Sequence, residues 1–220
     1  MFILFTYKNK MSSFDETTIQ IMKPSNEGYL EIILGPMFSG KTTQLIQIYN
    51  NYTYIGKKVV VVNYADDKRY HETMLSTHDR KMIPCISTTD ISDMWQNPLY
   101  ENYDDLREAD VILINEGQFF ENLKKTVIEM IDEKHKIVYI CGLDGDFRRN
   151  KFGELLHLIP YCNKVNKLSS LCAGCKNGTK GIFSCRITNE KSQVVIGSDN
   201  YKPLCRKCYN DSEKQYMKTI

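Results

Sequence analysis

The fold is decided by one stretch of the chain, Tyr29-Leu-Glu-Ile-Ile-Leu-Gly-Pro-Met-Phe-Ser-Gly-Lys-Thr42. Its first six residues, Tyr29 to Leu34, are mainly apolar and are typical of a buried β-strand. The next eight, Gly35 to Thr42, match the pattern G-x-x-x-x-G-K-[ST] in full. Apolar residues at helical spacing then follow between Thr43 and Tyr54. A strand, this loop and a helix, in that order, predict a phosphate-binding loop.

This loop has the chemistry that a nucleoside triphosphate requires. Its glycines let backbone N–H groups turn toward phosphate oxygens, and the N-terminus of the following helix adds the positive end of its dipole. We expect Lys41 to reach the β- and γ-phosphates and the Thr42 hydroxyl to ligate Mg²⁺. The predicted nucleotide-binding residues of the loop are Gly35, Pro36, Met37, Phe38, Ser39, Gly40, Lys41 and Thr42.

Further apolar runs extend the pattern of alternating strands and helices. A helix is predicted over Leu123–His135, and strands over Val59–Asn63, Ala109–Asn115, Ile137–Cys141 and Asn166–Leu171. Strands that are apolar at nearly every position are buried on both faces, which is typical of parallel sheets covered by helices. We therefore predict an α/β fold of the P-loop (RecA-like) type, with helices on both faces of a parallel sheet.

Polar residues end one of these strands where a second phosphate-site element is expected. Asn115 and Glu116 follow the apolar run Val111 to Ile114. An Asp usually closes such a strand and helps to hold Mg²⁺, whereas Asn115 keeps an acceptor oxygen and lacks the charge. Glu116, at a strand end facing the loop, is placed to serve as a general base for a hydroxyl nucleophile.

Paired cysteines dominate the C-terminal part of the chain. Cys172 and Cys175 form one C-x-x-C pair, and Cys205 and Cys208 form another. Four thiolates from two such pairs are typical of a closed, structural Zn²⁺ site. Short strand-like runs such as Gln193–Ile196 lie between the pairs. We predict a small zinc module in which the metal fixes both ends of the intervening segment.

Composition excludes several classes of protein. The 220 residues carry 29 Lys and Arg against 27 Asp and Glu, which is less basic than a dedicated duplex-DNA binder, so no nucleic-acid partner is expected. No apolar run reaches the roughly 18–20 residues of a membrane helix, and the N-terminus lacks the features of a signal peptide. We expect a cytoplasmic protein without a membrane partner. The predicted segments are an extension (1–28), a P-loop domain (29–170), a zinc module (171–210) and a tail (211–220).

Several short motifs in a fixed order resemble the type II thymidine kinase family, which is found in animal cytosol, many bacteria and large DNA viruses. The resemblance covers roughly residues 29–208. Besides the paired cysteines, the matching segments are Leu34-Gly-Pro-Met-Phe-Ser-Gly-Lys-Thr42, Tyr64-Ala-Asp-Asp-Lys-Arg-Tyr70, Thr77-His-Asp-Arg80, Glu116-Gly-Gln-Phe-Phe120, Leu143-Asp-Gly-Asp-Phe-Arg-Arg-Asn-Lys-Phe-Gly153 and Ile196-Gly-Ser-Asp-Asn-Tyr201.

The resemblance implies an activity, a partner set and roles for particular residues. ATP would donate its γ-phosphoryl group to the 5′-hydroxyl of thymidine, giving dTMP, with Glu116 as base and Lys41 and Arg69 stabilising the transferring group. The segment 176–204 would be a lasso that closes over the nucleoside. A homotetramer, feedback inhibition by dTTP and, for a virus, a location in the host cytoplasm are also implied. The implied nucleoside pocket comprises Met37, Gln118, Phe119, Leu143, Phe147, Phe152 and Tyr201.

Two other classes of P-loop protein are weighed against this interpretation. A GTPase-like switch needs N-K-x-D after a strand, and the nearest string, Asn163-Lys-Val-Asn166, lacks the Asp. A nucleic-acid-stimulated ATPase with a zinc module is disfavoured by the near-neutral charge. Phosphate transfer to free thymidine would separate a kinase from both.

Overall fold

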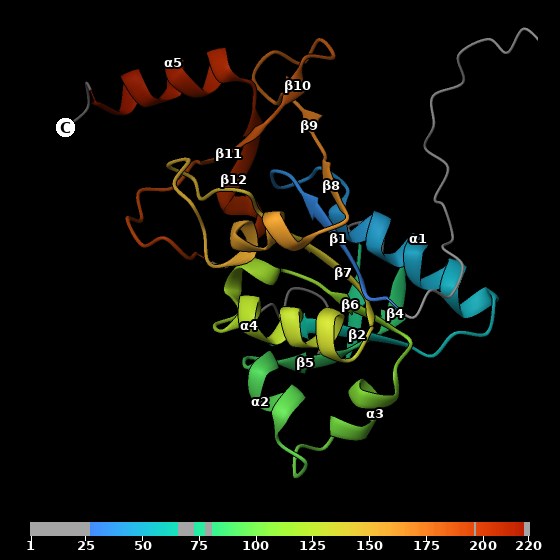
Figure 1. Cartoon of the computed structure of the whole chain (residues 1–220). Helices are drawn as coiled ribbons and strands as arrows, with labels where there is room; N and C mark the ends of the chain where they lie inside the picture. The colour runs from blue at the N-terminus through green and yellow to red at the C-terminus, as the bar shows by residue number, and fades with distance from the viewer. Residues whose placement is uncertain (1–26, 66–72, 78–80, 196, 218–220) are drawn as a thin grey trace, which may run out of the picture.

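The computed structural model describes residues 27–65, 73–77, 81–195 and 197–217. At its centre is a six-stranded sheet in the order β5-β2-β6-β7-β1-β8, in which every neighbouring pair is parallel (Figure 1). The strands are β1 (Tyr29–Leu34), β2 (Val59–Tyr64), β5 (Ile86–Thr88), β6 (Val111–Ile114), β7 (Ile137–Gly142) and β8 (Lys164–Lys167).

Helices cover both faces of this sheet. Helix α1 (Lys41–Tyr54) lies on one face. The other face is covered by α2 (Ile91–Gln96), α3 (Tyr103–Glu108), α4 (Leu123–Ile128), its continuation as a π-helix (Glu129–Glu133), and a 3₁₀-helix (Leu155–Tyr161).

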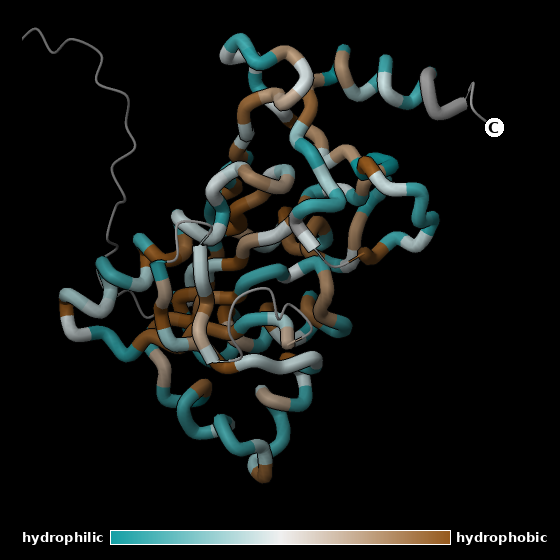
Figure 2. Tube along the Cα trace, turned by 180° about the vertical axis from the view of Figure 1, so that it is seen from behind, coloured by the Kyte–Doolittle hydropathy of each residue, from teal (hydrophilic) through white to brown (hydrophobic). Residues whose placement is uncertain are grey.

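Successive residues of β6 separate the two hydrophobic cores. Val111 and Leu113 pack with Leu45 of α1, whereas Ile112 and Ile114 pack on the opposite side, in the core that the other helices complete. All four β6 residues are buried, because strand side chains alternate between faces and both faces are covered. Figure 2 shows the same arrangement, with hydrophobic segments concentrated in the central sheet. The predicted α/β fold with a doubly covered parallel sheet is confirmed.

The C-terminal part forms a separate set of small elements. Strands β9 (Ser170–Leu171) and β10 (Lys180–Gly181) are antiparallel, as are β11 (Phe183–Arg186) and β12 (Tyr201–Leu204). Helix α5 (Arg206–Met217) follows, so the predicted tail begins inside a helix. Elsewhere, β3 (Met74–Ser76) and β4 (Met82–Pro84) form another antiparallel pair, and Gly117–Phe119 and Ser198–Asn200 are 3₁₀ turns.

Three predicted elements differ from the observed ones. The predicted strand over Asn166–Leu171 is wrong: β8 ends at Lys167, and β9 belongs to a different sheet. β8 is an edge strand, and three of its four residues are exposed, so its chain does not show the apolar run of a central strand. The helix from Leu123 changes to π geometry at Glu129 and ends at Glu133. The described part of the strand-like run, 193–195, is loop.

Charged side chains line the β8 edge. The Lys164 ammonium lies 3.5 Å from the Glu31 carboxylate, and the Lys167 ammonium lies 2.6 Å from that of Asp144. Among the strands that the structure describes, β8 pairs only with β1, so one side of its backbone faces away from the described sheet. Among the described residues, no helix has both the length and the apolar character that crossing a bilayer requires.

Candidate active site

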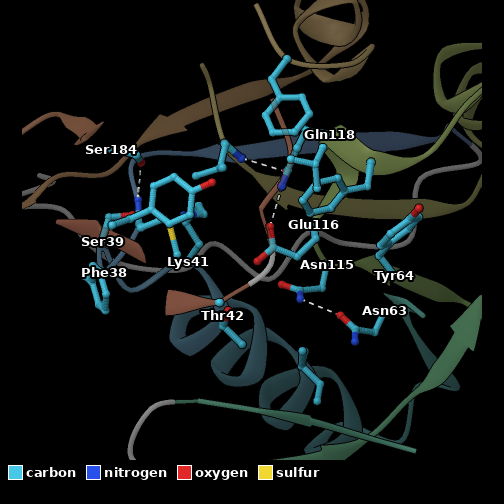
Figure 3. Close-up of a pocket in the computed structure, with 18 of the residues that line it drawn as sticks. Phe38, Ser39, Lys41, Thr42, Asn63, Tyr64, Asn115, Glu116, Gln118 and Ser184 are labelled. Carbon is cyan, nitrogen blue, oxygen red and sulfur yellow. Dashed lines mark hydrogen bonds between the residues drawn. The ribbon is translucent and has the colours of Figure 1, made fainter. Parts of the chain in front are cut away.

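A cavity of about 540 Å³ opens at the carboxyl ends of the central strands (Figure 3). In parallel α/β sheets this edge is where ligands bind. Loop residues Met37 to Thr42 line the cavity, together with Asn115 and Glu116 after β6. All seven residues of the predicted nucleoside pocket line it too: Met37, Gln118, Phe119, Leu143, Phe147, Phe152 and Tyr201. The predicted Arg69 lies outside the described residues, and Gly35 and Pro36 are not among the residues that line the cavity.

In the glycine-rich loop, the lysine side chain forms a hydrogen bond with the loop backbone. The Lys41 ammonium, at the first position of α1, donates to the Pro36 carbonyl at 2.8 Å. This contact holds the side chain back along the loop, with Phe38 at φ 62° and Gly40 at φ 85° forming the turn. The backbone N–H of Met37 donates to the Ser184 hydroxyl of β11 at 2.9 Å. The loop is therefore tied directly to the C-terminal module.

A buried chain of polar side chains lies under the loop. The Asn115 side-chain nitrogen donates to the Asn63 oxygen at 2.8 Å, and the Cys141 thiol donates to the Asn115 oxygen at 3.0 Å. Strand register explains both contacts, because Val62 pairs with Ile114 and Ile114 with Ile140, one residue before each partner. Burial raises the pKa of Cys141 to about 12, so this thiol keeps its proton and donates. Both ends of the Asn115 amide are thus engaged by the protein.

Glu116 occupies a conformation that non-glycine residues rarely adopt. Its φ of 55° and ψ of 42° place it in the left-handed region, directly between β6 and the 3₁₀ turn Gly117–Phe119. Such conformations cost about 1–3 kcal/mol and cluster at functional sites. This turn aims the Glu116 carboxylate into the cavity above the loop (Figure 3).

The Gln118 side chain holds that carboxylate. Its nitrogen donates to a Glu116 carboxylate oxygen at 2.7 Å, and its oxygen accepts from the Leu143 backbone N–H at 2.9 Å. Gly153, at φ 60°, lies against the Gln118 backbone so closely that a Cβ there would be 2.1 Å from the Gln118 carbonyl oxygen. Gln118 is therefore a cavity-lining residue whose side-chain amide bonds to the protein at both ends.

Aromatic rings form the wall opposite the loop. Tyr64 and Phe119 stack with ring centroids 5.0 Å apart, and Phe152 meets Phe119 edge-on at 5.3 Å. Leu143 adds apolar surface to the cavity, as does Met37 from the loop itself. A flat apolar wall next to a phosphate-binding loop is suited to a planar heterocyclic base.

The four paired cysteines lie together, as predicted for a metal site. Their sulfur atoms are all within 4.8 Å of one another: Cys172, Cys175, Cys205 and Cys208. Four sulfurs about 2.3 Å from a tetrahedral Zn²⁺ would be separated by about 3.8 Å, so the donor set fits this ion. Backbone N–H groups of Cys205 and Cys175 donate to the Cys172 sulfur at 3.1 and 3.5 Å. Burial alone would raise the pKa of the Cys172 thiol, but these donors outweigh burial and lower it to about 6.

Sequence reasoning missed several residues of the site. Asn63 ends a predicted strand, as Asn115 does, and Tyr64 follows it at the start of a matching segment, so both residues could have been noted. Ser184 gave no local signal. Asp146 lies in a matching segment and 193–195 in a strand-like run, but neither was assigned to the site, because only the folded structure brings them to the cavity.

Comparison with known proteins adds an independent finding. The family model described as "Thymidine kinase" matches residues 28–209. The thymidine kinase of Sheeppox virus (strain KS-1) is 40% identical over 183 residues, which cover 83% of this chain and 97% of the viral one. The thymidine kinase of rice (Oryza sativa subsp. japonica) is 38% identical over a region that covers 87% of this chain and 69% of the rice one. The thymidine kinase of Vaccinia virus (strain Western Reserve) is 37% identical over 85% of this chain and 99% of the viral one. This chain belongs to the thymidine kinase family.

Proposed function

We propose that this protein phosphorylates thymidine, using ATP as the phosphoryl donor and giving dTMP and ADP. The observation that carries the proposal is the placement of the Glu116 carboxylate in one cavity with a complete phosphate-binding loop and an aromatic wall. Family membership supports the same substrate pair. We place the reaction in the cytoplasm, where ATP is available and thiolate zinc ligands stay reduced.

The glycine-rich loop binds the triphosphate in this scheme. Its backbone N–H groups and the N-terminus of α1 hold the phosphate oxygens, and Lys41 exchanges its bond to the Pro36 carbonyl for the β- and γ-phosphates. The Thr42 hydroxyl, at the start of α1 and on the cavity wall, would hold Mg²⁺, which neutralises phosphate charge when bound. Arg69 completes the proposed phosphate site.

Glu116 acts as the general base. The nucleoside lies along the aromatic wall with its 5′-hydroxyl toward the Glu116 carboxylate, which accepts the hydroxyl proton. The 5′-oxygen forms a bond to the γ-phosphorus as the bond from that phosphorus to the bridging oxygen of ADP breaks. Gln118 fixes the carboxylate oxygen that does not take the proton, through its 2.7 Å hydrogen bond. Positioning and electrostatics supply most of the acceleration in such reactions.

The C-terminal module closes the nucleoside site. The zinc module, residues 171–210, contains the proposed lasso, residues 176–204, and Zn²⁺ held by the four cysteines would fix both ends of it in a structural role. The lasso contributes to the cavity wall through Val194, Val195 and Tyr201. Exclusion of water by this segment limits transfer of the phosphoryl group to solvent. On the family resemblance we also propose inhibition by dTTP at this site and a homotetramer.

The experiment is phosphorylation of a nucleoside panel with ATP and Mg²⁺. Wild type is compared with Glu116→Gln, and with Glu121→Gln as a control for an exposed carboxylate nearby. Thymidine-selective product that falls at least 100-fold in Glu116→Gln and is unchanged in Glu121→Gln is the expected result. ATP hydrolysis without any nucleoside product, and surviving Glu116→Gln, would return the chain to the switch or nucleic-acid-stimulated ATPase classes.

A further inference from the structure

A single buried arginine organises the segment that covers the cavity. Arg186 ends β11, and its side chain is almost enclosed, with 9% of the residue exposed. Its two terminal nitrogens donate to the carbonyls of Glu190 and Gln193, each at 3.0 Å, to the Ser192 carbonyl, and to the Tyr201 hydroxyl at 2.5 Å. The four hydrogens on these nitrogens thus meet four acceptors.

The acceptors are neutral, which is unusual for a buried guanidinium. In the part of the chain that the structure describes, no carboxylate forms an ion pair with Arg186. Burying a charge without such compensation is costly. Here the Phe147 ring, whose centroid is 3.8 Å from the guanidinium carbon, and the Tyr201 ring, at 5.1 Å, supply cation–π contact in addition to the four hydrogen bonds.

The loop that supplies three of these acceptors, residues 187–195, has little structure of its own. Ile187 donates its backbone N–H to the Asn200 carbonyl at 2.9 Å. From residue 188 to residue 195, no further backbone–backbone hydrogen bond is formed among the described residues. The loop is therefore folded chiefly by wrapping its carbonyls around the Arg186 side chain.

This arrangement reaches the cavity through other residues. Arg186 itself is not on the cavity wall, but its partners Phe147, Gln193 and Tyr201 are, and so are Val194 and Val195 next to its acceptors. The Tyr201 hydroxyl also donates to the Val195 carbonyl at 3.2 Å. The shape of this wall thus depends on a side chain that no ligand in the cavity touches.

We propose that Arg186 is a positioning residue that folds the 187–195 loop into a wall of the nucleoside pocket. In part this inference rests on the proposed function, because it assigns the pocket to the nucleoside. Lysine cannot fully replace Arg186, since one ammonium offers three hydrogens from a single point, whereas Arg186 reaches four acceptors from two separate nitrogens. Loss of Arg186 then weakens nucleoside binding and spares ATP binding.

The test uses the full-length protein with three substitutions. Arg186→Met removes the donors and keeps an unbranched side chain, and Arg186→Lys keeps the charge. Arg148→Met is the matched control, since the exposed Arg148 also contacts Phe147, with its guanidinium carbon 4.9 Å from the ring, and donates one bond of 3.2 Å to the loop, at the Lys191 carbonyl. Two quantities are measured: the initial rate of tryptic cleavage after Lys191 without substrates, and the separate KM values for thymidine and ATP.

We expect Arg186→Met to be cleaved after Lys191 at least tenfold faster and to raise the thymidine KM at least tenfold, with the ATP KM changed less than about twofold. For Arg186→Lys, the cleavage rate and the thymidine KM should lie between those of Arg186→Met and wild type. If Arg186→Met does not fold, the test rests on the values of Arg186→Lys. Arg148→Met should keep both wild-type KM values, and its cleavage rate should change less than that of Arg186→Met, because it loses a single bond to the loop. Wild-type cleavage and KM values in both Arg186 variants, or equal rises in the two KM values, would overturn the proposal. Cleavage reports on the loop even if wild type fails to phosphorylate thymidine, so the two proposals fail separately.

Discussion

The side-chain nitrogen of Gln118 lies 2.7 Å from a carboxylate oxygen of Glu116, two residues before it in the chain. The same side chain accepts the Leu143 N–H through its oxygen. Replacement of Gln118 by Met keeps the approximate volume and removes both bonds. We expect kcat to fall about 10- to 100-fold with the thymidine KM changed by less than about threefold, because the base is still present but no longer held. Steady-state kinetics with varied thymidine measures both constants.

The opposite pattern of changes in kcat and KM would support another role for Gln118. A large rise in the thymidine KM with an unchanged kcat would make this residue a nucleoside ligand, as the sequence resemblance implied. The Leu143 N–H loses its acceptor in the variant, so a fall of about 1–3 kcal/mol in the free energy of unfolding is also expected.

The Asn63–Asn115 pair should behave as one energetic unit. Both side chains are buried, and they share the 2.8 Å amide hydrogen bond. Each single substitution to Ala should lower the free energy of unfolding by about 1–3 kcal/mol, and the double variant should cost about 0.5–1.5 kcal/mol less than the sum. Urea unfolding of the four proteins in this cycle measures the coupling. If the losses of unfolding free energy in the two single variants simply add in the double variant, the two side chains are not coupled and the predicted energetic contribution of their hydrogen bond is contradicted.

The Mg²⁺ concentration that activity requires should stay nearly the same when an acidic residue replaces Asn115. In Asn115→Asp the carboxylate replaces an amide that already bonds to Asn63 and Cys141, beneath the loop. We expect the Mg²⁺ concentration for half-maximal activity to stay within about twofold of wild type, because Thr42 and the phosphates would hold the ion. A markedly lower requirement in the variant would show that position 115 limits Mg²⁺ binding.

Removal of zinc should disable the nucleoside site before the central sheet unfolds. Cys208→Ser takes away one of the four sulfurs, and Cys162→Ser serves as control because that cysteine lies outside the cluster. Wild type and the control should each hold about one Zn²⁺ per chain, whereas Cys208→Ser should lose the metal and raise the thymidine KM. Metal analysis measures the zinc content, steady-state kinetics gives the thymidine KM, and far-UV circular dichroism reports whether the secondary structure is kept. A variant that loses zinc with unchanged kinetics would separate the module from the pocket.

Stability at high pH should depend on Tyr139. This buried residue lies under α1, with its hydroxyl 3.0 Å from that of Tyr52, and burial together with this bond raises its pKa well above the usual value near 10. The unfolded chain loses the Tyr139 proton from about pH 10 upward while the folded chain keeps it, so the free energy of unfolding falls as pH rises.

The Tyr139→Phe variant should therefore show a shallower loss of stability between about pH 10 and 12 than wild type. The slope should not vanish, because burial also raises the pKa of Tyr209, to about 12. Tyr54→Phe, at a position that is 91% exposed, should retain the wild-type slope. Urea unfolding at a series of pH values gives the three slopes, and equal slopes for wild type and Tyr139→Phe would contradict the assignment.

The central sheet could be predicted because its strands carry their own signal. β1, β2, β6 and β7 are nearly continuous apolar runs, and burial on both faces is the physical cause of that composition. The stretch 74–108 was not assigned, because its strands have three residues each and its helices six, too short for a periodic pattern to stand out.

The site was predictable where chemistry follows one motif and hidden where it depends on tertiary contacts. The glycine-rich loop and the paired cysteines could be identified from their spacing, and Glu116 from its place directly after an apolar strand. The resemblance implies that Gln118 belongs to the nucleoside pocket, which stays a prediction, and the sequence offers no view of its bonds to Glu116 and Leu143. Arg186 gave no signal, since three of its four acceptors are backbone carbonyls, which every residue possesses.

The charged edge of the sheet bears on how copies of this chain can associate. A strand of a second molecule docking along β8 would have to desolvate the ammonium groups of Lys164 and Lys167 or break their ion pairs with Glu31 and Asp144. Lysines at an open edge are a known protection against such strand addition, which otherwise leads to fibrous aggregates. The charged β8 edge therefore disfavours continuation of the sheet into a second molecule.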